Sequence, residues 1–147
     1  MKLHTAAEVI SFAKTLEDES TEFYENLSQR YPKDKDVFLS FAKENEKYVT
    51  QFQRAYYSVI TDAIESCFAF DIETDEYTFT TELSEKANYS AALTRALEIE
   101  RKIIKFYSDA AEQSGSLMAD VPRAFALIAK KMGSREQQLR SLLEREG

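Results

Sequence analysis

The sequence has very little glycine, proline or cysteine, and it has no tryptophan. Its 147 residues include 3 glycines, 2 prolines and 1 cysteine. Because glycine and proline interrupt helices and form turns, their scarcity favours long helices over a fold with many short strands. The single cysteine, Cys67, excludes an internal disulfide and a cysteine-rich metal site. Long helices stabilised by packing are therefore the expected fold.

The chain also lacks an excess of positive charge and a long apolar run. Its formal net charge is −7, so general attraction to nucleic acid or to an anionic membrane is not expected. No stretch is long and apolar enough to span a membrane, and the first ten residues do not resemble a signal peptide. We expect a cytoplasmic protein without nucleic-acid or membrane partners.

Apolar residues recur at helical spacing in the first half of the chain. A capping box formed by Thr5 and Glu8 predicts the start of a first helix. Pro32 predicts its end, because proline disfavours the helical conformation of the preceding residue. No glycine or proline interrupts the apolar pattern that follows, so a second helix is predicted from about residue 36 to 69.

The second half of the chain repeats the pattern of the first. Glu17 and Tyr24 recur 83 positions later as Glu100 and Tyr107, each time in the phrase E-x5-F-Y. The third and fourth helices are predicted on either side of a break at residues 114–122. This internal duplication predicts two helical hairpins that bury their apolar faces against each other.

An acidic connection separates the two halves. Residues 70–88 are predicted to form a crossover, with a short helical turn at 80–86. Strand-like alternation is found only at residues 77–81 and is too short to support a sheet. The prediction is one all-α domain over residues 1–147, a four-helix bundle made of hairpins 5–69 and 89–146.

Glu17 and Glu100 lie in the middle of the apolar faces of the first and third helices. Burying a lone carboxylate is unfavourable, so each needs a hydrogen bond, a cation or a proton. Two carboxylates at equivalent positions of a duplicated chain predict a common site at the bundle centre. The alternative is that the helices are rotated and both acids face the solvent.

The matching phrases AKTLEDESTEFYENLS and ALEIERKIIKFYSDAA resemble the rubrerythrin-like branch of the ferritin-like superfamily, as do FLSFAKENEKYVTQF and FALIAKKMGSREQQL. The resemblance spans about residues 6 to 145 and implies a ferritin-like bundle with a di-iron carboxylate centre. It implies that Glu17 and Glu100 are metal ligands. It further implies that Tyr24 and Tyr107 hydrogen-bond these carboxylates; the alternative is that both tyrosines only fill the core.

The remaining positions of the family's metal motif are substituted. The resemblance places Asn45 and Met132 where the family has glutamate, and Tyr48 and Arg135 where it has histidine. Asparagine, methionine and neutral tyrosine are poor iron ligands, and arginine carries a permanent positive charge. The only histidine, His4, lies outside the repeat. We therefore expect the two glutamates to be vestigial ligands, and we expect no cofactor.

Arg135 is predicted to replace the metal electrostatically. Its planar guanidinium can donate to two carboxylates, so we expect it to bridge both glutamates, with Asn45 and Tyr48 completing the hydrogen bonds. The excess negative charge then predicts a raised pKa for one carboxyl. The alternative is that Arg135 extends to the surface along its apolar stem. Met132 is expected to fill the core.

The aromatic-rich run at residues 52–70 carries apolar residues on more than one helical face. This pattern predicts a homodimer contact through Tyr56, Tyr57, Ile60 and Ile64. The alternative is that the crossover folds back and covers these side chains.

Two functions are compatible with the sequence. The preferred one is a non-catalytic, dimeric helical bundle that has lost its metal. The alternative is an iron-dependent oxidoreductase of the rubrerythrin type, peroxide-reducing or iron-oxidising, in which Glu44, Glu46 or Glu136 completes the site. Turning these acids inward requires a one-residue shift that also turns the aromatic residues outward, which argues against the alternative.

Overall fold

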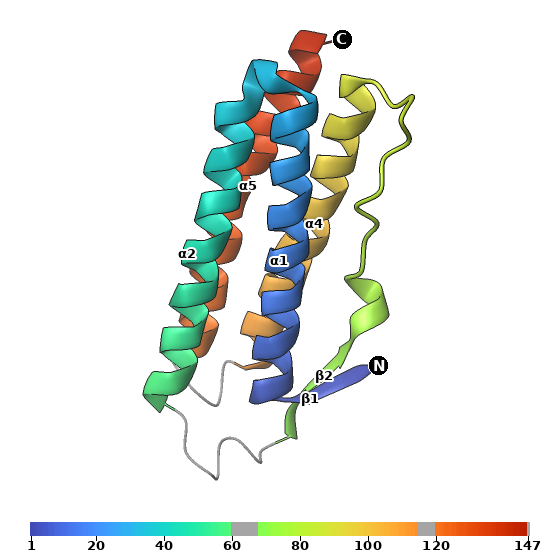
Figure 1. The fold of residues 1–147 in the computed structure, drawn as a ribbon. Helices are drawn as coiled ribbons and strands as arrows, with labels where there is room; N and C mark the ends of the chain where they lie inside the picture. Colours follow the sequence, from blue (N-terminus) through green and yellow to red (C-terminus); the bar gives the residue numbers. More distant parts are fainter. Residues whose placement is uncertain (60–67, 115–119, 147) are drawn as a thin grey trace.

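The structure, a computed structural model, describes residues 1–59, 68–114 and 120–146. Within these residues, four α-helices lie side by side as an elongated bundle (Figure 1). None of these helices is both long and apolar enough to cross a membrane. The helices are α1 (Ala6–Arg30), α2 (Lys35–Val59), α4 (Tyr89–Gln113) and α5 (Asp120–Glu146).

The helices form two hairpins that share one core. α1 packs mainly on α2, and α4 packs mainly on α5, while contacts between α2 and α5 and between α1 and α4 join the hairpins. The crossover carries the chain back along the bundle before α4 begins, so α2 and α4 run in the same direction (Figure 1). This is the arrangement of a four-helix bundle with one long crossover connection.

The predicted start of α1 is confirmed. The amide of Glu8 donates to the Thr5 hydroxyl at 3.2 Å, and the amide of Thr5 donates to the Glu8 carboxylate at 3.0 Å. The helix ends at Arg30, and Pro32 opens the short 3-10 helix η1 (Pro32–Asp34). In the predicted break at 114–122, α5 already begins at Asp120, because proline is tolerated in the first turn of a helix.

The prediction of a second helix up to residue 69 is wrong at its end. Phe68–Glu73 forms a strand, β2, which pairs antiparallel with β1 (Lys2–Thr5). Residues 60–67 lie outside the described part of the chain. In this pairing Leu3 lies opposite Ile72, and both side chains are buried. The N-terminal segment therefore supplies backbone partners that the local helical pattern could not reveal.

The prediction of a short helical turn in the crossover is also wrong. Residues 80–86 contain only a turn, closed by a 3.0 Å hydrogen bond from the Ala87 amide to the Ser84 carbonyl, and residues 77–81 form no strand, as expected from their short alternation. The short helix of the crossover is instead the 3-10 helix η2 (Thr74–Glu76), which directly follows β2. Arg30 donates to the carbonyls of Ser84, Glu85 and Ala87, so the crossover is anchored through its backbone.

Of the predicted dimer contact residues, the structure describes Tyr56 and Tyr57, and only one of them is exposed. Tyr56 is only 4% exposed and is therefore already packed within the chain, whereas Tyr57 is 66% exposed. Ile60 and Ile64 lie outside the described residues. Of the predicted contact residues that the structure describes, only Tyr57 is accessible to a partner.

Candidate functional site

Glu17 on α1 and Glu100 on α4 lie at the centre of the bundle. Their exposed fractions are 1% and 0%, so the predicted inward orientation is confirmed. Both side chains lie among buried apolar residues that recur at steps of three and four along their helices. The rotated arrangement, with both acids in solvent, is excluded.

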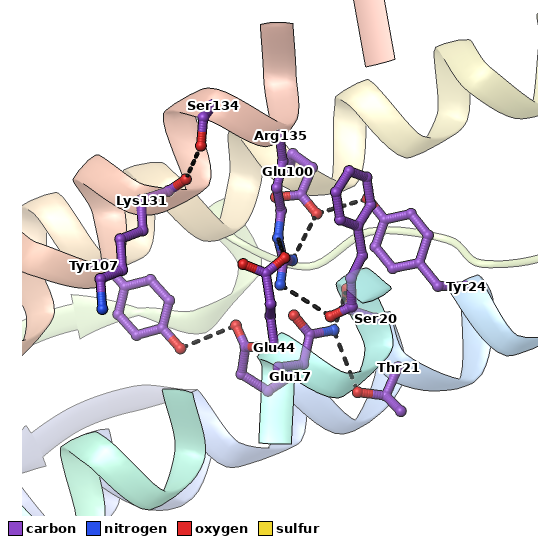
Figure 2. A network of polar contacts seen from close by, with 12 residues as sticks. Glu17, Ser20, Thr21, Tyr24, Glu44, Glu100, Tyr107, Lys131, Ser134 and Arg135 are labelled. Carbon is purple, nitrogen blue, oxygen red and sulfur yellow. Dashed lines mark hydrogen bonds and ion pairs between the residues drawn. The ribbon is translucent and has the colours of Figure 1, made fainter. Parts of the chain in front are cut away.

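Each carboxylate accepts a hydrogen bond from a tyrosine of the other half of the chain. The hydroxyl of Tyr24 donates to Glu100 Oε1 at 2.6 Å, and the hydroxyl of Tyr107 donates to Glu17 Oε1 at 3.0 Å (Figure 2). The prediction that these tyrosines hydrogen-bond the carboxylates is confirmed. The two bonds are reciprocal, because the tyrosine of each hairpin donates to the glutamate of the other hairpin.

Arg135 on α5 points into the same centre and is only 1% exposed, so its predicted burial is confirmed. Its Nη1 donates to Glu100 Oε1 at 3.2 Å, and its Nη2 donates to the backbone carbonyl of Phe41 at 2.9 Å. The guanidinium also lies 5.0 Å from the ring centroids of Phe41 and Tyr48. Such cation–π contacts are favourable when the cation is desolvated.

The predicted bridge from Arg135 to both glutamates is wrong. Among the described residues, the one hydrogen-bond donor to Glu17 is Tyr107. The guanidinium instead divides its donors between Glu100 and the Phe41 carbonyl, and its Nε faces Glu44 Oε1 at 3.6 Å. The two hydrogen bonds that the guanidinium donates therefore go to Glu100 and to the main chain of α2, and neither goes to Glu17.

The prediction that Asn45 and Tyr48 complete the hydrogen bonds of the glutamates is also wrong. The Asn45 side-chain amide is fully buried and donates to the hydroxyls of Ser20 at 3.1 Å and Thr21 at 3.2 Å. Tyr48 contributes its ring to Arg135, while its hydroxyl has no hydrogen-bond partner in the described structure. Asn45 therefore links α2 to α1 directly.

Several buried polar atoms of this cluster have no hydrogen-bond partner in the described structure. Because buried polar atoms are normally partnered, the hydrogen bonding of this cluster is incomplete for both carboxylates. A proton on one carboxyl both supplies a donor and removes a buried charge. The unpartnered atoms are Glu17 Oε2, Glu100 Oε2, Asn45 Oδ1, Tyr48 OH and Arg135 Nε.

The two carboxyls differ in their electrostatic surroundings. Burial raises the pKa of Glu17 to about 8, and the attraction of Arg135 and the hydrogen bond from Tyr107 offset burial only in part. Burial also raises the pKa of Glu100, but Arg135 and Tyr24 both donate to this carboxylate and oppose the shift. We therefore interpret Glu100 as the ionised partner of Arg135 and Glu17 as the carboxyl that carries a proton at neutral pH.

The residues at the centre do not fit the di-iron site that the resemblance implies. Arg135 places a guanidinium on one of the two carboxylates, and the buried side chain of Met132 stands at another ligand position. Glu46 is exposed, and Glu136 forms ion pairs at the surface with Arg101 and Arg140. In the described parts of the chain, no three histidine, cysteine, aspartate or glutamate side chains are grouped so that they could hold a metal ion.

Comparisons of the chain with models of protein families, with curated proteins and with solved structures found no match. The resemblance to the rubrerythrin-like branch therefore stays a prediction from the sequence phrases.

Three contributors to the cluster were not predicted. The backbone carbonyl of Phe41 accepts from Arg135, and no sequence pattern indicates an acceptor on the main chain. Thr21 lies beside the predicted inward face and still reaches Asn45. Glu44, considered only as a metal ligand, contacts Arg135 from the rim of the bundle. Its position three residues after Phe41 on α2 is the one signal that could have indicated this contact.

Proposed function

We propose that the chain is a ferritin-like four-helix bundle without catalytic activity, in which an arginine has taken the place of a di-iron centre. The observation that carries this proposal is the position of Arg135, which is buried and bound to Glu100 at the centre of the bundle. A permanent cation there repels a metal cation and occupies a carboxylate oxygen that a metal would need.

Two further observations support a ferritin-like origin. The hairpins are joined by one long crossover, and the Tyr24–Glu100 and Tyr107–Glu17 hydrogen bonds relate the hairpins reciprocally. In the proposed ancestor these carboxylates held metal. In the present chain both join α1 to α4, and Glu100 also binds Arg135 of α5.

We propose that the bundle acts as a structural or binding module in the cytoplasm and forms a homodimer. The exposed ring of Tyr57 is the described part of the predicted contact. Sedimentation equilibrium tests this assignment, because a monomer at all accessible concentrations contradicts it. Tyr57→Lys is expected to weaken the dimer if this ring lies in the interface.

Metal analysis tests the proposed function. Protein purified without chelators is analysed by elemental mass spectrometry, before and after loading with iron(II) in air. We expect less than stoichiometric iron and no oxo-bridge absorption. Two iron ions per chain with that absorption would overturn the proposal. A variant with Asn45→Glu, Tyr48→His, Met132→Glu and Arg135→His serves as a positive control, because it restores the motif that the resemblance implies.

The alternative is an iron-dependent oxidoreductase with an atypical site. It is favoured by one observation, the unpartnered Oε2 atoms of Glu17 and Glu100. The loading experiment distinguishes the two functions, since the alternative requires that iron binds in the presence of Arg135.

A further inference from the structure

The outer face of α2 carries three exposed cations, Lys43, Lys47 and Arg54, which line one hollow along this helix. None of them forms an ion pair with the described residues. The cations of α1 and α4 differ, because each of them bonds a carboxylate or a main-chain carbonyl of the same chain. A basic face without internal partners is suited to a negatively charged surface, which a second copy offers because the chain has a net charge of −7.

The outer face of α1 carries the opposite charge. Glu22 and Glu25 are exposed and form no ion pair with the described residues, and Asp18 is paired with Lys14 at 2.7 Å. Glu25 and Lys43 line the same hollow between the two helices. The acidic row of α1 and the basic row of α2 therefore meet on one face of the first hairpin.

Contacts inside the hairpin fix which residues of α1 and α2 lie at the same level of the bundle. The Asn45 side chain donates to the Ser20 hydroxyl at 3.1 Å, and the ring centroids of Tyr24 and Phe41 lie 5.3 Å apart. Because the two helices are antiparallel, each step forward along α2 corresponds to a step backward along α1. Both contacts give the same alignment.

This alignment places Lys43 level with Glu22 and Lys47 level with Asp18. A twofold axis that runs parallel to the bundle, over the groove between α1 and α2, lays α2 of each copy on α1 of the other without changing these levels. In such an isologous contact each pair of facing residues occurs twice. Both lysines then face a carboxylate of the other copy, so rows of opposite charge meet on both sides of the axis.

We propose that this face of the first hairpin is the contact between two copies of the chain, with α2 of each copy lying on α1 of the other. The inference rests on the homodimer of the proposed function and assigns its surface. Leu39 and Tyr57 are 43% and 66% exposed. They lie about one turn before and about four turns after Lys43, and thus on the same side of α2. The crossover runs beside α4 and leaves this side of α2 uncovered (Figure 1).

The test is complementation between two charge-reversed variants, measured by sedimentation equilibrium at low salt. Lys43→Glu and Glu22→Lys each turn both symmetric contacts into like-charge pairs, so each variant alone is expected to weaken the dimer about tenfold. In a mixture of the two variants, both contacts again join opposite charges. We therefore expect mixing to recover most of the lost affinity. Both positions are exposed, so both variants are expected to fold.

Two matched controls separate this contact from a general effect of net charge. Lys130→Glu on α5 and Glu112→Lys on α4 make the same charge changes at exposed positions away from this face. We expect Lys130→Glu not to complement Glu22→Lys, and Glu112→Lys not to complement Lys43→Glu. Because exposed ion pairs are screened by salt, the parent dimer is also expected to dissociate as the salt concentration rises.

The possible failures are distinguishable. A dimer that neither reversal weakens, that mixing does not restore, or that the control variants restore equally well would overturn the assigned surface and leave the homodimer in place. A monomer at all concentrations would overturn both. The metal content of the bundle centre does not enter this measurement, so either result leaves the absence of a di-iron centre to the iron-loading experiment.

Discussion

The two hairpins share a carboxylate-and-tyrosine frame but differ at the residues that face it from α2 and α5. Each hairpin contributes one glutamate and one tyrosine, and each tyrosine bonds the glutamate of the other hairpin. α2 then presents Asn45 and Tyr48, whereas α5 presents Met132 and Arg135. The glutamates and tyrosines are therefore equivalent in the two hairpins, but only α5 adds a positive charge.

Because of this difference, Glu17 and Glu100 occupy equivalent positions but have different electrostatic surroundings. Glu100 accepts from both Tyr24 and Arg135, while Glu17 accepts from Tyr107 alone. The local dielectric constant is low in a bundle centre, so the hydrogen bonds from Arg135 and Tyr24 favour the ionised form of Glu100 over that of Glu17. The other acid is accommodated in its protonated form.

Removing Arg135 is expected to have the largest effect. In Arg135→Met, Glu100 is left buried without its cation, and we expect a loss of roughly 3–5 kcal/mol in the free energy of unfolding at pH 7. Denaturant unfolding measures this loss. Arg140→Met removes an exposed cation from the same helix and is expected to cost less than about 1 kcal/mol. A loss of similar size in both variants would contradict the assigned role of Arg135.

The pH dependence of stability tests the protonation of Glu17. Its pKa is about 8 in the folded protein and 4.5 when unperturbed, so the folded state binds this proton more tightly. The stabilisation is fully present below pH 4.5 and is lost as the pH rises through 8. We expect a decrease on the order of 3–4 kcal/mol between pH 5 and 9.

Glu17→Gln provides the control for this pH series, because the amide cannot titrate. The pKa of the Met1 amine is also raised, chiefly by its hydrogen bond to Glu73, and it contributes a loss of the same sign at high pH. That contribution persists in Glu17→Gln. If the variant and the parent show the same slope between pH 5 and 8, Glu17 is not the protonated group.

The tyrosine pair is expected to show the smallest effects. Tyr24→Phe removes a 2.6 Å bond to an ionised carboxylate and is expected to cost about 1.5–3 kcal/mol, while Tyr107→Phe removes a bond to a neutral carboxyl and costs about 0.5–1.5 kcal/mol. Thermal or denaturant unfolding at pH 7 compares them. Tyr48→Phe, which removes an unpartnered hydroxyl, is expected to be close to neutral. Equal losses for Tyr24 and Tyr107 would remove the distinction between the two acids.

The helical part of the fold was predictable because its signals are local. The Thr5–Glu8 capping box, the stop at Pro32 and the apolar spacing act within one or two turns of a helix, and the structure confirms each of them. The sheet was not predictable in this way. β1 and β2 lie more than 60 residues apart, and their pairing depends on the fold that brings them together.

The candidate site shows the same contrast between local signals and contacts that depend on the fold. Helical periodicity and duplication predicted that Glu17, Glu100 and Arg135 face one centre, and all three are buried there. The partners of Arg135 were predicted only in part, because the Phe41 carbonyl competes with Glu17 for the guanidinium. Rotamers and main-chain acceptors on a neighbouring helix are not encoded by the spacing of residues along one helix.

By itself the sequence determined which side chains are buried, because the period of a helix and the cost of exposing apolar surface act on each segment separately. Only the tertiary structure decided which acid keeps its charge. That choice depends on which of the two carboxylates the Arg135 guanidinium bonds, and this contact exists only after the four helices have packed.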